Sequence, residues 1–430
     1  MDRLVSNAMD AAARPFTHLI PALSVEKTLA THEVQQAFAY LEDCEEEITN
    51  EQVAICSIPA SPFNESARAQ YLKNKFIEDG FQETDVDEEG NCIAFRAGNS
   101  GKPLVVVSAH LDTVFPSNTD FRVRRIGNRL VGPGTSDDGC GLAAVIALGR
   151  VLQALGVSTI GSLLFVGSVG EEGEGNLRGV RHLFTKGRWA GSIDAFISFD
   201  GPGVECITNR ALASRRYRVM VRGAGGHSWA DFGTANPVHA LGRAVAKLAS
   251  YPAPLQPRTT FNVARIIGGT SVNAIPVEAS MDVDLRSATH DGLVQLDAFF
   301  RRSLQEATDE ENAAARKDTR LLELAVDLIG ERPGGETPPD STLVEFAGRA
   351  TRILGIKPQL DQASTDANLP MSLGIPAITL GAGGNSANSH TLDEWYDPTD
   401  RLTALKRALL LILALVGISR ESVDRNHDSG

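Results

Sequence analysis

Two histidines and several carboxylates follow predicted strands or turns in five short segments of the chain. The segments are Ser108-Ala-His-Leu-Asp112, Gly134-Thr-Ser-Asp137-Asp138-Gly139, Gly170-Glu171-Glu172, Ser198-Phe-Asp200-Gly201 and Asn388-Ser-His390. Mixed nitrogen and oxygen donors, with one carboxylate available to be shared, are the ligands that a pair of bridged zinc ions requires. The segments therefore predict a two-metal site, provided that the fold brings them together.

Three apolar runs without polar alternation precede most of these side chains and predict strands that are buried on both faces. The runs are 103–108, 162–168 and 194–199, and they lead to His110, to Glu171 and Glu172, and to Asp200. In open α/β sheets, ligands collect at the carboxyl ends of parallel strands. We therefore expect the four side chains to meet at one sheet edge.

Each segment taken alone also has a plain structural explanation. Asp137 and Asp138 precede a predicted helix over 142–155, where adjacent acids commonly cap the helix and face its positive end. Glu171 and Glu172 would also fit a solvated acidic loop. The glycine-rich turn before Asp137 favours the metal interpretation, because it lets one carboxylate project into a site. Adjacent glutamates can also divide the work, since one binds a metal while its neighbour accepts a proton.

The two histidines are weak signals individually. His110 and Asp112 form an HxD pair, which is common in loops, but Asp112 is placed to hydrogen-bond the imidazole nitrogen that faces away from a metal. His390 lies in a glycine- and asparagine-rich loop after the last predicted strand, at 376–380. A lone loop histidine is seldom a ligand, yet here it supplies a second imidazole.

Strands and helices alternate over residues 1–210 and again over 331–430, which predicts an α/β sandwich with a mostly parallel sheet as the catalytic domain. Residues 211–330 instead follow a β-α-β-β-α-β order, typical of a ferredoxin-like α+β domain. We expect this second domain to be inserted into the first as a lid and dimerisation domain. The turn-rich segment 331–339 is predicted to be the linker back.

Bulk properties exclude several function classes. A chain of 430 residues is too long for one core, and its net charge of −13 argues against nucleic acid and anionic membrane surfaces as partners. The five scattered cysteines lack a CxxC pair, and the segment 1–6 has no signal-peptide pattern, so a reducing, cytoplasmic location is expected. The apolar run 408–418 is shorter than the roughly 20 residues that span a bilayer, which predicts a buried helix and no membrane role.

The ordered motifs resemble a family of di-zinc metallopeptidases. The family includes tripeptidase T, the carnosine-type dipeptidases, aminoacylase, acetylornithine deacetylase, succinyl-diaminopimelate desuccinylase and bacterial glutamate carboxypeptidase. The resemblance implies that His110 and Asp200 hold one zinc ion and that Glu172 and His390 hold the other. It also implies that Asp137 bridges the two ions. Cobalt or manganese would accept the same ligands.

The resemblance also assigns roles around the metals. It implies that Glu171 is the general acid/base, that Asp112 orients its neighbouring histidine, and that the peptide bond after Asp137 is cis. In the lid, His227 of the Gly225-Gly-His segment resembles the family's histidine that reaches the partner subunit's active site and stabilises the oxyanion. Asn273 and Arg286 resemble residues that contact substrate, the arginine through a substrate carboxylate. A homodimer is therefore expected.

Two positions distinguish this chain within the family. Gly139 stands where the family usually has lysine or asparagine. Asp200 is aspartate, as in the members that take peptides with a free amino terminus, whereas deacylases and carboxypeptidases tend to have glutamate. The sequence thus resembles the tripeptidase T-like branch most, and predicts a zinc aminopeptidase for di- or tripeptides.

Two other functions remain open. The same di-zinc centre would serve an N-acyl-amino-acid deacylase or a carboxypeptidase. A binding or scaffold relative without catalysis would normally have lost a ligand or the base, and all of them are present here.

Overall fold

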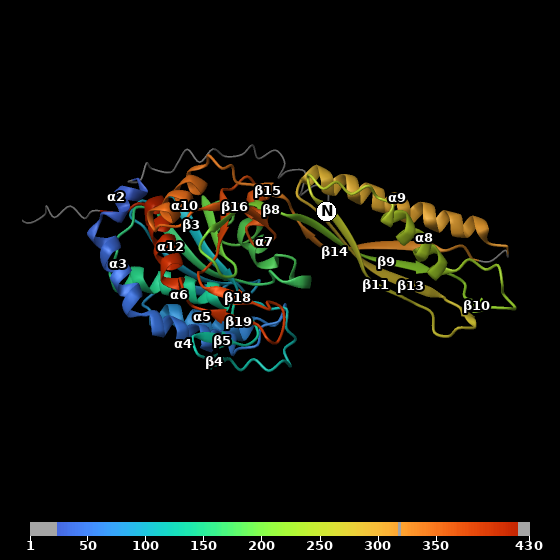
Figure 1. The fold of residues 1–430 in the computed structure, drawn as a ribbon, viewed down its shortest axis with the longest axis horizontal. Helices are drawn as coiled ribbons and strands as arrows, with labels where there is room; N and C mark the ends of the chain where they lie inside the picture. The colour runs from blue at the N-terminus through green and yellow to red at the C-terminus, as the bar shows by residue number, and fades with distance from the viewer. Residues whose placement is uncertain (1–23, 317–319, 420–430) are drawn as a thin grey trace, which may run out of the picture. The chain divides into compact units, whose positions relative to one another are not determined.

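The structure is a computed structural model that describes residues 24–316 and 320–419, so the segment 1–6 lies outside the described residues. The chain divides into two compact units. The first comprises Met1–Ala211 and Glu336–Gly430, and the second is Leu212–Gly335. The second unit is therefore inserted in sequence into the first (Figure 1).

The first unit is built on a nine-stranded mixed sheet in the order β1-β2-β6-β3-β7-β17-β8-β15, with β16 also paired to β8. Its centre is parallel and consists of β6 (Ser162–Ser168), β3 (Leu104–His110), β7 (Ala195–Phe199) and β17 (Ala377–Leu380). The outer strands are β1 (Glu83–Val86), β2 (Cys92–Arg96), β8 (Cys206–Ala211), β15 (Gly335–Glu336) and β16 (Gln359–Ala363). The α/β class with a mostly parallel sheet is confirmed.

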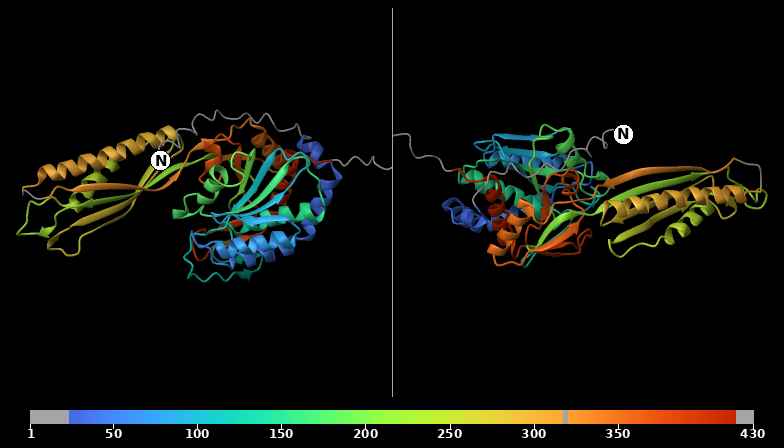
Figure 2. Two further views of the ribbon diagram at one scale, coloured as in Figure 1. Left: turned by 180° about the vertical axis from the view of Figure 1, so that it is seen from behind. Right: turned by 90° about the horizontal axis from the view of Figure 1, so that it is seen from above.

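Helices cover both faces of this sheet, because alternate side chains of the buried strands point to opposite faces (Figure 2). Val105 and Val107 of β3 belong to the core on one face, and Val106 to the core on the other. The first core includes residues of α2 (Val25–Leu29), α3 (His32–Asp43), α4 (Glu45–Cys56), α5 (Ser66–Glu78), α6 (Gly139–Ala154), α10 (Thr342–Ile353) and α12 (Arg401–Val416). The second includes residues of α7 (Arg178–Thr185) and α11 (Asn368–Ser372).

A small antiparallel sheet in the same unit joins two segments that are far apart in the sequence. Its order is β18 (Asn385–Ala387), β19 (Trp395–Asp397), β5 (Arg129–Val131) and β4 (Arg124–Ile126). β5 leads into the turn that carries Asp137, and the loop between β18 and β19 carries His390. This sheet therefore brings two predicted ligand segments side by side.

The second unit has a four-stranded antiparallel sheet in the order β11-β13-β9-β14. Along the chain its elements are β9 (Ala213–Arg222), α8 (Pro237–Ala249), β11 (Thr259–Gly268), β13 (Glu278–Ser287), α9 (His290–Ala314) and β14 (Glu323–Arg332). Both helices lie on one face of the sheet (Figure 1). The order is that of the ferredoxin-like split arrangement. A short ladder, β10 (Gly226–His227) with β12 (Ala274–Ile275), lies outside this sheet.

Several boundaries differ from the sequence prediction. α9 spans His290–Ala314 and so extends the predicted helix 292–307 at both ends, with Thr289 as its N-cap. The segment 331–339 is not simply a linker, because β14 continues to Arg332 and β15 occupies Gly335–Glu336. The apolar run after 408 forms most of α12, which is buried. Within residues 24–316 and 320–419, no helix has the length and apolar character needed to cross a membrane.

Candidate metal centre

His110 is the last residue of β3 and is almost completely buried. Its Nδ1 lies 3.0 Å from the backbone oxygen of Asp112, and its Nε2 lies 2.9 Å from Oδ1 of Asp137. The Asp112 carboxylate is farther from Nδ1, with Oδ1 at 3.7 Å. Asp112 thus contacts the histidine mainly through its own carbonyl group, which holds the ring with Nε2 directed toward Asp137.

The Asp112 carboxylate instead binds the backbone of the two glutamates that follow β6. Its Oδ1 accepts a hydrogen bond from the backbone N–H of Glu171 at 3.0 Å, and its Oδ2 accepts one from Glu172 at 2.7 Å. Asp112 is fully buried, so these bonds are shielded from water. The carboxylate therefore fixes the backbone of both glutamates relative to the end of β3.

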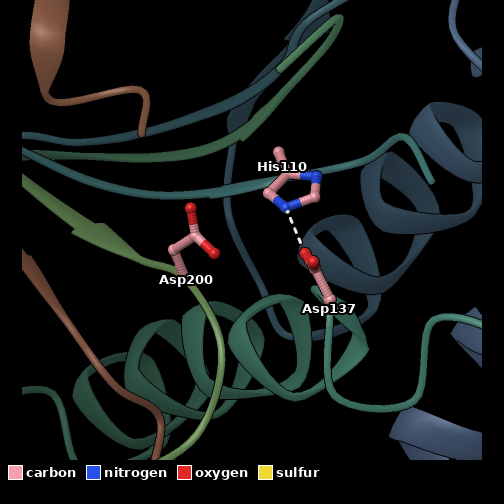
Figure 3. A group of neighbouring side chains, drawn as sticks. All are labelled: His110, Asp137 and Asp200. Atoms are coloured by element: carbon pink, nitrogen blue, oxygen red, sulfur yellow. Dashed lines mark hydrogen bonds and ion pairs between the residues drawn. The ribbon is translucent and has the colours of Figure 1, made fainter. Parts of the chain in front are cut away.

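Asp137 lies between the two predicted histidine ligands. Its Oδ1 contacts His110 Nε2 at 2.9 Å, and its Oδ2 contacts His390 Nε2 at 2.8 Å. The Asp137–Asp138 peptide bond is cis, as the resemblance implies. Figure 3 shows Asp200, which follows β7, facing the same space as His110 and Asp137. A carboxylate that reaches two imidazoles from its two oxygens is placed to bridge two metals.

His390 and Glu172 complete the opposite side of the site. His390 Nε2 lies 3.1 Å from Glu172 Oε1. The His390 side chain is half exposed, whereas Glu171 and Glu172 are buried. Three groups of donor atoms lie within 4.8 Å of one another: His110–Asp137–Asp200, Asp137–Glu172–His390 and His110–Glu171–Glu172. The first two groups share Asp137. The structure thus brings together all five predicted metal ligands, with Glu171 beside them.

Buried carboxylates give the site an excess of negative charge. Burial raises the pKa of Asp138, and burial together with the nearby Asp137 raises the pKa of Asp200. Burial acts in the same direction on Asp137, but its hydrogen bonds with His110 and His390 outweigh it and lower the pKa. Divalent cations would relieve this repulsion directly. The donor set, two imidazoles with clustered carboxylates, fits zinc, cobalt or manganese.

The imidazoles are correspondingly basic. Hydrogen bonds with Asp137 and then Glu172 raise the pKa of His390 to about 10. Burial lowers the pKa of His110, but the carboxylates of Asp112 and Asp137 outweigh burial and hold it well above its usual range. Because a histidine binds a metal through an unprotonated nitrogen, a cation must displace these protons.

Sequence reasoning missed Glu394, which is fully buried and holds the turn before Asp137. Its carboxylate accepts hydrogen bonds from the backbone N–H groups of Gly134, Ser136 and Asp137 at 3.0, 2.7 and 3.1 Å. Its signal in the sequence is weak, since it is one acid in a loop. The partners are about 260 positions away, so no local pattern identifies them.

The structure also explains Gly139. A Cβ atom there would lie 2.2 Å from Cys56 Sγ and 2.6 Å from the backbone oxygen of Gly134. The Cys56 thiol contacts that same oxygen at 3.3 Å. Cys56 therefore fills the space that a side chain at position 139 would need, which gives a physical reason for glycine where the family usually has lysine or asparagine.

The three remaining predicted residues belong to the second unit. His227 Nδ1 accepts hydrogen bonds from the backbone N–H groups of Trp229 and Ala230 at 3.2 and 3.3 Å. A neutral His227 must then carry its proton on Nε2, which makes that atom a donor. Asn273 is adjacent, since its backbone oxygen accepts from Ser228 N at 3.0 Å. Arg286 Nε donates to Asp284 Oδ2 at 2.6 Å, which orients the guanidinium.

The sequence profile of peptidase family M20/M25/M40 matches residues 106–415. The chain belongs to this family. The match covers the strands and loops that carry all the predicted ligands, and it confirms the resemblance drawn from the motifs. A curated relative, the putative succinyl-diaminopimelate desuccinylase DapE of Mycobacterium tuberculosis (strain CDC 1551 / Oshkosh), is 26% identical over 331 residues, covering 74% of this chain and 85% of its own.

Solved structures share the fold of this M20-family protein. The aminopeptidase PepT from Bacillus cereus ATCC 10987 superposes with a TM-score of 0.67 at 23% identity, covering 86% of this chain and 97% of its own. The YXEP protein of Bacillus subtilis, described as a dinuclear metal binding peptidase of the M20 family, has a TM-score of 0.63 at 18% identity. That match covers 88% of this chain and all (100%) of YXEP. At these identities the likeness shows the fold.

Proposed function

We propose that this M20-family protein is a di-zinc aminopeptidase that hydrolyses short peptides, di- or tripeptides. One observation carries the proposal: two donor groups, each with one imidazole, share the carboxylate of Asp137. This is the arrangement expected of a pair of bridged ions. His110 and Asp200 would hold one zinc ion, and Glu172 and His390 the other. The bound ions would polarise the scissile carbonyl and lower the pKa of the attacking water.

Glu171 is proposed as the general base. It is buried beside His110 and Glu172, and its backbone is held by Asp112. Its neighbour Glu172 contacts His390, and Glu171 would accept a proton from water on a carboxylate oxygen. Glu171 would then deliver that proton to the leaving amine as the carbon–nitrogen bond breaks.

The second unit would supply groups that bind the substrate. His227 would donate from Nε2 to the oxygen that becomes negative, because its Nδ1 is occupied as an acceptor. Arg286, oriented by Asp284, would bind a substrate carboxylate, with Asn273 beside the peptide. We propose further that His227 acts in the active site of the partner subunit of a homodimer.

The match to a putative desuccinylase favours one alternative, an N-acyl-amino-acid deacylase with the same metal centre. The name of the PepT relative and the aspartate at position 200 favour the peptidase. A panel of free dipeptides, free tripeptides and N-acylated amino acids, assayed with the zinc-loaded protein, separates the two. We expect turnover of the free peptides. Activity confined to the N-acylated compounds would overturn the aminopeptidase proposal.

A further inference from the structure

The two segments that carry Asp137 and His390 leave the small sheet side by side. Strand β5 pairs with β19 through Leu130 opposite Tyr396 and Val131 opposite Trp395. The next backbone contact runs from Gly132 N to the Glu394 oxygen at 2.9 Å. After β5 the chain continues to Asp137, whereas β19 is preceded by the loop that contains His390. Glu394 is therefore located where the two ligand segments diverge.

The side chain of Glu394 extends this contact beyond the sheet. Its Oε1 accepts hydrogen bonds from Ser136 N, Ser136 Oγ and Asp137 N at 2.7, 2.8 and 3.1 Å, and its Oε2 accepts one from Gly134 N at 3.0 Å. A carboxylate has about four acceptor positions, so these four donors match its capacity. Bonds to an ionised acceptor are also about twice as strong as neutral ones.

These contacts link one metal ligand's backbone to the loop of another. Asp137 N is held by a residue four positions after His390, and the Asp137 carboxylate meets His390 Nε2 at 2.8 Å. Ser136 Oγ and Ser389 Oγ, at 3.2 Å, connect the same two segments once more. A shift of either segment would therefore disturb the other segment's ligand.

We infer that Glu394 is a positioning residue that holds the Asp137 turn and the His390 loop in one arrangement, so that both ligands are presented to the metals together. The inference rests on the proposed function, because it assumes that both side chains bind metal. Glu394 is completely buried, so it is not placed to contact substrate itself. Its effect is exerted through Asp137 and His390.

The test is zinc affinity in Glu394→Gln, measured by competition with a chromophoric chelator. Glutamine keeps the size of the side chain but turns one acceptor into a donor that faces backbone N–H groups. The matched control is Asp393→Asn, which removes an exposed carboxylate one residue earlier in the same loop. Loss of a group that orients metal ligands typically costs about 10–100-fold in affinity. We expect a loss of that size for Glu394→Gln and a change within about twofold for the control.

The absorption spectrum of the cobalt-loaded protein provides a second readout, because it reports ligand geometry rather than fold stability. We expect altered bands in Glu394→Gln and wild-type bands in Asp393→Asn. If Glu394→Gln does not fold, Glu394→Asp keeps the charge but withdraws it from the turn, and it should show the same loss to a smaller degree. Wild-type affinity and spectrum in the folded variant, or an equal loss in the control, would overturn the inference. A wild-type protein that binds no metal would overturn the proposed function instead.

Discussion

At the scale of single residues, the site depends on groups that each perform one task. Asp137 contacts both predicted histidine ligands, and Glu172 contacts His390, whereas we propose that the neighbouring Glu171 moves a proton. The contact with His390 belongs to Glu172, and the proposed division of the acidic pair rests on it. The sequence alone predicted the pair but offered no contact that distinguishes its two members.

The basic imidazoles lead to a prediction about pH. The pKa of His390, about 10 in the fold, exceeds its usual value of 6.5. In chelator-treated protein, protonated His390 therefore stabilises the fold fully below pH 6.5, and this contribution is lost as pH rises through about 10. The difference in unfolding free energy between wild type and His390→Gln should shrink over this range, as measured by urea denaturation. A free-energy difference that grows with pH would contradict the raised pKa of His390 in the folded protein.

Gly139 and Cys56 form a pair that can be tested by a double-mutant cycle. Gly139→Ala places a Cβ atom against Cys56 Sγ and the Gly134 oxygen, so we expect a destabilisation of about 1–3 kcal/mol. Cys56→Ala removes the sulfur, and the double variant should recover part of the loss because the backbone contact remains. Urea denaturation of the four proteins measures the coupling. Strict additivity would show that the thiol does not restrict position 139.

At the scale of secondary structure, the candidate metal centre is assembled at the ends of parallel strands and of a small sheet. β3, β6 and β7 lead to His110, to Glu171 and Glu172, and to Asp200, while β5 and β18 lead to Asp137 and His390. Asp112 connects the ends of β3 and β6, because its carboxylate accepts hydrogen bonds from the backbone N–H groups of Glu171 and Glu172. The spacing of the candidate ligands is thus set by the paired strands that precede them and not by the loops alone.

Asp112→Asn tests this connection. The amide keeps one acceptor and turns an NH₂ group toward a backbone N–H, so one of the two bonds is lost. We expect kcat to fall by about 10–100-fold while the protein stays folded. Asp194→Asn is the control, because Asp194 Oδ2 also accepts a hydrogen bond from a backbone N–H, that of Leu104 at 2.7 Å, but at the first residue of β3, whereas His110 is the last. An equal loss of kcat in both variants would contradict the role of Asp112.

Much of this element pattern could be predicted from the sequence, and the reasons for the failures are physical. Continuous apolar runs identify β3, β6 and β7, since both faces are buried. The strands of the small sheet have only three residues each, too few to show a period. Glu394 was missed for a related reason: of its donors Gly134 N, Ser136 N, Ser136 Oγ and Asp137 N, three are backbone N–H groups, which carry no sequence signal. The five candidate ligands could be predicted because their side-chain types and order are specific, and the structure brings them together.

At the scale of the whole molecule, family membership follows from a match over residues 106–415, which includes the inserted unit. That unit carries His227, Asn273 and Arg286, and its short β10–β12 ladder places His227 opposite Ala274. We propose that these residues complete the site in a homodimer. A symmetric dimer contains two copies of every such contact, which makes the proposal testable by mixing inactive variants.

Mixing Glu171→Gln with His227→Ala should restore activity if His227 acts across the dimer. A mixed dimer then has one site with both residues intact, so an equal mixture that exchanges subunits should reach about a quarter of wild-type activity. Each variant assayed alone is the control. Absence of any restored activity, with subunit exchange demonstrated by a labelled chain, would show that His227 does not act in the partner's site.

The most direct measurement is peptide turnover by Glu171→Gln with its metal content determined on the same sample. Glutamine keeps the shape of Glu171 but cannot accept the proton, and general bases typically contribute about 10²–10⁴-fold. We predict two zinc ions per chain in both wild type and variant, with turnover of short peptides reduced by at least about 100-fold in the variant. Wild-type turnover in a variant that retains both ions would contradict the account.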